Sequence, residues 1–143
     1  MKEETEDIGM LFKKITERLE KSGNEYFSTL GVTLSQVRVL HFIHGQPQGK
    51  TTQKELEDAY DVSHPTINGI LKRLEKKNLI RTNITTNRRL SKEVCLTEEG
   101  FALLKETNKS KISMKRIMAK NFTKQEIAAL KDMLKRIADN LSE

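Results

Sequence analysis

Residues 63–80, SHPTINGILKRLEKKNLI, constrain the fold most, because they combine helix signals, an apolar stripe and cations. Ser63 is a favourable helix N-cap, and Pro65 falls in the first turn, where no backbone N–H is required. The apolar positions recur at helical spacing: Ile67, Ile70, Leu71 and Leu74. We expect a short helix with one buried and one exposed face, and Asn78 suits the left-handed position after its end.

Positive charge is concentrated between residues 63 and 92. This segment contains eight Lys or Arg and one acidic residue, a net charge of +7, whereas the whole chain of 143 residues carries +6. The remainder of the chain is therefore close to neutral. Such clustering is typical of a protein that binds a polyanion.

Apolar periodicity predicts further helices. We expect them over residues 8–30, 33–45, 52–60, 98–120 and 123–141. Three begin with a capping box, in which a threonine and a Gln or Glu three residues later bond each other's backbone amides. These boxes start at Thr33, Thr52 and Thr123. Leu56, Ala59 and Tyr60 are expected to form one face of the helix over residues 52–60. The helix over residues 33–45 is expected to stop at Gly45, and the segment GQPQGK there to be a loop.

The periodicity changes after Leu79. The segments LIRTNI and KEVCLT are compatible with β-strands, and TTNRRLS between them has turn chemistry with Arg88 and Arg89 at its tip. This pattern predicts a two-stranded hairpin, or wing.

A short helix, a tight turn, a basic helix and a hairpin together indicate a winged helix-turn-helix. We therefore predict a mainly α, single-domain protein over residues 1–143 with a small β-hairpin wing. The winged lobe spans residues 33–97, and residues 1–31 and 98–143 form dimerisation helices. A homodimer is expected because the apolar seams at both chain ends exceed what one small lobe can cover.

The basic helix contains the candidate DNA-binding residues. Its outward positions and wing tip predict contacts from Ser63, His64, Thr66, Asn68, Gly69, Lys72, Arg73, Lys76, Arg88 and Arg89. Asn68 can bond an adenine edge bidentately, and Gly69 permits close backbone approach. The amides beside Ser63 can receive a phosphate.

The cations divide into two groups. Those of the helix are expected to hold the phosphate backbone and supply affinity: Lys72, Arg73, Lys76 and Lys77. Arg88 and Arg89 are expected to enter a minor groove or bind phosphate. Two-fold symmetry would place the two helices about one DNA turn, roughly 34 Å, apart.

The segments LEDAYDVSHPTINGILKRLEKKNLI and CLTEEG, with the hairpin between them, resemble the MarR family of bacterial transcription regulators. The resemblance implies a homodimer with intertwined first and last helices that binds pseudo-palindromic double-stranded DNA. It also implies a repressor that a small-molecule effector, of unknown identity here, releases from DNA. No cofactor is implied.

The wing departs from the family pattern. The family usually has an aspartate followed by an arginine pair shortly before the LT segment, whereas Arg88, Leu90 and Ser91 occupy those positions here. The arginine that usually follows LI is also shifted or missing, since Arg81 precedes Thr82. The family's docking geometry for the wing is therefore not carried over.

Several residues have two interpretations. His64 is expected either to contact a base or to be solvent-exposed or capping. Cys95 is interpreted as structural rather than redox-active, and His41 and His44 as packing or surface residues rather than zinc ligands. Met114 and Met118 are assigned to helix packing rather than to a ligand pocket.

The sequence gives less support to two other function classes. Catalysis is not expected, because the chain has no phosphate loop, nucleophile elbow or metal-ligand run. The alternative is a winged helix that docks on an acidic or regulatory protein partner. The acidic first residues and the lack of a long apolar run predict a cytoplasmic protein with no membrane span.

Overall fold

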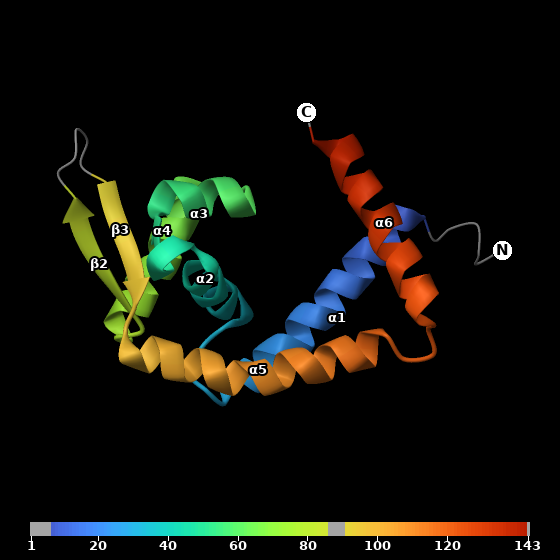
Figure 1. Ribbon diagram of the computed structural model, residues 1–143, viewed down its shortest axis with the longest axis horizontal. Helices are drawn as coiled ribbons and strands as arrows, with labels where there is room; N and C mark the ends of the chain where they lie inside the picture. The colour runs from blue at the N-terminus through green and yellow to red at the C-terminus, as the bar shows by residue number, and fades with distance from the viewer. Residues whose placement is uncertain (1–6, 86–90, 143) are drawn as a thin grey trace. The chain divides into compact units, whose positions relative to one another are not determined.

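The computed structural model describes residues 7–85 and 91–142. Its helices are α1 Ile8–Ser28, α2 Leu34–Gly45, α3 Gln53–Tyr60, α4 His64–Lys76, α5 Glu98–Met118 and α6 Lys124–Leu141, with a 3-10 turn, η2, at Pro47–Gly49. The strands are β1 Lys50–Thr52, β2 Ile80–Thr85 and β3 Ser91–Leu96 (Figure 1). The chain divides into two compact units between Thr107 and Asn108. The helices and the small antiparallel sheet confirm the mainly α fold expected from the sequence.

The sheet has one more strand than the two-stranded hairpin expected from the sequence. Its order is β1-β3-β2, and both pairings are antiparallel. In β1, Thr51 pairs with Val94 of β3, and both side chains are buried. The loop prediction was therefore wrong at its end, because three residues are too few for an alternating pattern to appear.

Two of the three expected capping boxes are present in full, at Thr33 and Thr123. At Thr52 the box is incomplete. The Thr52 hydroxyl accepts from the Glu55 amide at 3.2 Å, but the Glu55 carboxylate accepts from the Thr51 hydroxyl at 2.9 Å instead of bonding the cap amide. A neighbouring hydroxyl thus takes the place of the backbone donor.

The core lies in the first unit, between α2, α3, α4 and the sheet. Its fully buried large side chains include Leu40, Ile43, Leu56, Ile67, Leu74 and Val94. The expected face of α3 was wrong in part, since Ala59 is exposed. Tyr60 is also exposed, at 37%, and its hydroxyl donates to the Arg38 carbonyl at 2.8 Å. Partial burial raises the pKa of the Tyr60 phenol, because loss of hydration disfavours the charged form.

The end of α4 is closed as its sequence predicts. Asn78 has φ of 59°, the left-handed conformation. Its amide donates to the Glu75 carbonyl at 2.9 Å, and the Leu79 amide donates to the Leu74 carbonyl at 3.0 Å. This pair of bonds is a Schellman motif, and it directs the chain straight into β2.

Thr97 joins this turn to the start of α5. Its amide donates to the Leu79 carbonyl at 3.1 Å, and its hydroxyl donates to the Asn78 carbonyl at 2.7 Å. The same hydroxyl accepts from the Gly100 amide at 3.0 Å. A Cβ on Gly100 would lie 2.1 Å from the Leu79 carbonyl oxygen. Only glycine therefore fits where α5 crosses the turn after α4.

In the second unit, α6 buries none of its side chains. The seam expected from the sequence is largely uncovered, with Leu130 38%, Leu134 39% and Leu141 81% exposed. Within residues 7–85 and 91–142, no helix is both long and apolar enough to cross a membrane.

We expect Gly100→Ala to lower the free energy of unfolding by more than about 2 kcal/mol, because backbone atoms must move to admit the methyl group. Urea unfolding followed by circular dichroism measures this change. Gly45→Ala is the matched control, since a Cβ there meets no atom within 4 Å. Equal stability of the two variants would contradict the close crossing.

Candidate nucleic-acid interface

Helix α4 has one buried and one open face. Ile67, Leu71 and Leu74 are 1%, 5% and 0% exposed, and they pack against α2 and α3. Ser63 caps the helix, because its hydroxyl accepts from the Thr66 amide at 3.4 Å and lies 2.9 Å from the Thr66 hydroxyl. The buried stripe and the cap therefore determine which side chains face outward.

The outward face is centred on four residues spaced four, three and four apart: Pro65, Gly69, Lys72 and Lys76. At 100° per residue, these lie opposite Ile67 and Leu74. Asn68 is half-buried at one flank of this face. Pro65 was not among the sequence candidates, although its spacing of four from Gly69 could have identified it.

Gly69 leaves space on this surface. A Cβ there would meet only the tip of the Arg73 side chain, at 3.4 Å. The position is therefore not required to be glycine by packing within the lobe. Its lack of a side chain exposes the helix backbone between Lys72 and Pro65, where a partner can approach closely.

His64 is held by α3. Its Nδ1 lies 2.5 Å from Glu57 Oε1 and 3.0 Å from Gln53 Nε2. The Glu57 side chain is only 17% exposed, whereas the His64 side chain is 71% exposed. The imidazole thus bonds the preceding helix while one side of its ring remains accessible. Sequence reasoning did not include this bond, which links residues seven apart on two helices.

Lys77 is engaged within the lobe. Its ammonium donates to the Gly31 carbonyl at 2.7 Å and to the Gln36 amide oxygen at 2.9 Å. Lys72, Arg73 and Lys76 are exposed on α4. Lys77 is exposed as well, but it differs from the other three cations in that its ammonium bonds two acceptors of the lobe.

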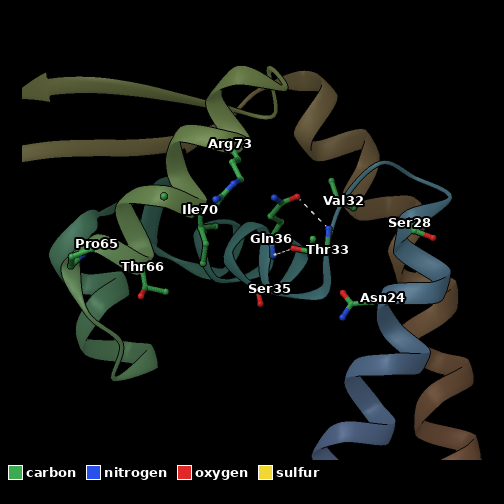
Figure 2. Close-up of a pocket in the computed structure, with 11 residues that line it drawn as sticks. Asn24, Ser28, Val32, Thr33, Ser35, Gln36, Pro65, Thr66, Ile70 and Arg73 are labelled. Carbon is green, nitrogen blue, oxygen red and sulfur yellow. Dashed lines mark hydrogen bonds between the residues drawn. The ribbon is translucent and has the colours of Figure 1, made fainter.

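A hollow of about 820 Å³ lies beside the open face of α4. Figure 2 shows its α4 wall, with Ile70 and Arg73, and its α2 wall, with Ser35 and Gln36. Asn24 of α1 borders the same hollow and accepts from the Leu34 amide at 2.9 Å. Arg73 is thus placed at the edge of the outward face rather than at its centre.

The strands carry Arg81 and Lys92, which are exposed, whereas the predicted wing-tip residues Arg88 and Arg89 lie outside the described residues. Cys95 is half-buried in β3, and its thiol contacts the Arg81 carbonyl at 3.8 Å. This contact agrees with the structural role assigned to Cys95.

The two histidines of α2 have non-metal contacts. His41 Nε2 lies 3.2 Å from the Thr107 hydroxyl, and the His44 ring packs on Phe101. In the part of the chain that the structure describes, no three His, Cys, Asp or Glu residues are grouped as metal ligands would be.

Comparisons with known proteins agree with this geometry. Residues 30–89 match the model of the MarR family. The chain is similar to a cysteine-to-serine variant of MarR from E. coli solved with operator DNA, at 25% identity and a TM-score of 0.81, over 91% of this chain and 92% of that one. The segment over residues 30–89 therefore resembles the MarR family.

Two further solved structures share the fold. MepR of S. aureus in complex with DNA has a TM-score of 0.87 at 20% identity, over 95% of this chain and 97% of MepR. The transcriptional regulator SlyA has a TM-score of 0.86 at 22% identity, over 95% and 94%. The chain therefore has the fold of these solved structures over nearly its whole length.

We expect His64 and Glu57 to be coupled by about 1 kcal/mol in a double-mutant cycle of the two alanine variants, since either single change breaks the same bond. Urea unfolding of the four proteins gives this coupling. Asp58 replaces Glu57 in the control cycle, because it is exposed on the same helix. Coupling as small in the Glu57 cycle as in the Asp58 cycle would show that the bond contributes nothing.

Proposed function

We propose that this chain is a homodimeric regulator of the MarR family that binds double-stranded DNA by sequence, and that it represses transcription until a small-molecule effector releases it. The observation that carries the proposal is the open face of α4, where Gly69 leaves the backbone accessible beside the exposed cations Lys72, Arg73 and Lys76. The DNA complexes solved for MarR and MepR support the same use of this lobe.

The side chains of α4 have different roles in DNA binding. Lys72, Arg73 and Lys76 hold phosphates, which supplies affinity for any sequence. Asn68 bonds a base edge from the flank of the face, and an adenine matches its paired donor and acceptor. Ser63, His64 and Thr66 lie at the helix start, where the backbone amides favour a phosphate.

Exposed apolar side chains support the homodimer. On α1, Ile8, Met10 and Ile15 are 63%, 55% and 53% exposed. On α6, Met133 and Leu134 are 49% and 39% exposed. Apolar residues that repeat along both terminal helices need cover from another chain, and a two-fold pair supplies it to both copies.

A second hollow in the first unit supports a role for an effector. Its volume is about 510 Å³, within the range of roughly 300–1,000 Å³ common for small-molecule sites. Leu30, Leu79 and Leu103 form apolar parts of its lining, beside Glu99 and Glu106. A ligand there would contact both the end of α1 and the turn after α4.

We expect Asn68→Ala to weaken binding to the preferred duplex by about 1–3 kcal/mol, because one bidentate base contact is lost. Binding to a scrambled duplex should change little. Fluorescence anisotropy titrations on both duplexes measure the two affinities. If both weakened equally, Asn68 would have no role in reading the sequence.

Gly69→Ala separates folding from binding. The methyl group has space in the free protein, so the free energy of unfolding should stay the same or rise by up to about 1 kcal/mol. The same methyl group should lower affinity for the preferred duplex by about tenfold, since the DNA backbone passes close to this position. Full affinity of a stable Gly69→Ala protein would show that DNA does not approach the helix here.

Lys76→Ala should weaken binding to every sequence and reduce the slope of log K against log salt by about 0.9, the value for one phosphate contact. Titrations at four or more salt concentrations give the slope. An unchanged slope would place Lys76 away from phosphate. A wild-type protein that binds no duplex at low salt would instead favour docking on a protein partner.

A further inference from the structure

We infer that Lys77 is a positioning residue: it ties the end of the recognition helix α4 to the α1–α2 turn and so sets the orientation in which α4 meets DNA. This inference rests on the proposed DNA-binding function. It assigns Lys77 a different role from the neighbouring lysine, Lys76, although the two look equivalent in the sequence.

Lys77 bonds two groups that lie close together in the chain, at the α1–α2 turn and in the first turn of α2. Its Nζ donates to the Gly31 carbonyl at 2.7 Å and to Gln36 Oε1 at 2.9 Å. Both acceptors lie more than forty residues earlier in the chain. Lys77 is exposed, yet its ammonium is directed to these two acceptors and not away from the lobe, as a lysine that holds phosphate would be.

The two acceptor groups are positioned by contacts that do not involve Lys77. Gly31 has φ of 76° at the end of the α1 region, and the following amide of Val32 donates to the Phe27 carbonyl at 3.1 Å. Gln36 is 4% exposed, and its Oε1 also accepts from the Thr33 amide at 3.2 Å in the capping box of α2. One amide oxygen therefore serves both the start of α2 and the end of α4.

This arrangement connects three helices by charge-assisted hydrogen bonds, which are stronger than neutral ones. The C-terminal end of α4 has its carbonyl dipoles beside Lys77, which favours a cation at this position. If α1 forms part of the dimer interface, the bond transmits the position of that interface to the recognition helix. The distance between the two helices of a dimer then depends on Lys77.

The test compares Lys77→Met with Lys76→Ala on a duplex that the wild-type protein selects from a random pool. Two further duplexes have one base pair added or removed at the centre of that site. We expect Lys77→Met to lose about tenfold in affinity for the selected duplex, with an unchanged salt slope and a smaller preference for the selected spacing. Lys76→Ala should flatten the slope and keep the spacing preference.

Lys77→Arg is the rescue variant. Its guanidinium keeps the charge and the donors, and the hollow of about 510 Å³ beside Lys77 has room for the larger group. We expect it to restore both the affinity and the spacing preference. If Lys77→Met lowers the folded fraction, Lys77→Gln replaces it in the same titrations, because its shorter amide also cannot make both bonds.

Three results would overturn the inference. They are a salt slope that falls for Lys77→Met as it does for Lys76→Ala, an affinity equal to that of the wild type, and a spacing preference that does not relax. Failure of the wild-type protein to select any duplex is a different outcome, since it would contradict the proposed function itself.

Discussion

The burial of one stripe of α4 determines which side chains of this helix face outward. Ile67, Leu71 and Leu74 are almost completely buried, so rotation of the helix by even one residue position would expose them. Each such side chain contributes about 1.5–3 kcal/mol when fully buried, which fixes the opposite face as firmly as the core itself. Gly69, Lys72 and Lys76 face outward as a consequence of this packing.

Both ends of α4 are fastened by polar contacts that complete this constraint. At its start, His64 bonds Gln53 of α3 and lies beside the Glu57 carboxylate, and Ser63 supplies the cap. At its end, the turn through Asn78 is crossed by α5, where Gly100 allows contact with the Leu79 carbonyl. The helix is therefore held at two ends and along one side, as a rigid surface for recognition requires.

Local signals were enough to predict most of this fold, because caps, apolar periodicity and turn residues act over a few positions. The N-cap at Ser63 and the left-handed Asn78 are examples. Contacts between distant segments were not predictable in the same way. The bond of Lys77 to Gly31 spans 46 residues, and strand β1 is defined only by its pairing with β3. The outward face of α4 was predictable from the sequence, whereas the different contacts of Lys77 and the other cations were not.

In the proposed function, two copies of the open face of α4 read one DNA site. Selection of duplexes by the wild-type protein from a random pool, followed by sequencing, tests this arrangement. We expect an enriched site with two inverted half-sites whose centres are about one helical turn, roughly 10 base pairs, apart. A pool that shows no enriched sequence, or only a single isolated half-site, would contradict it.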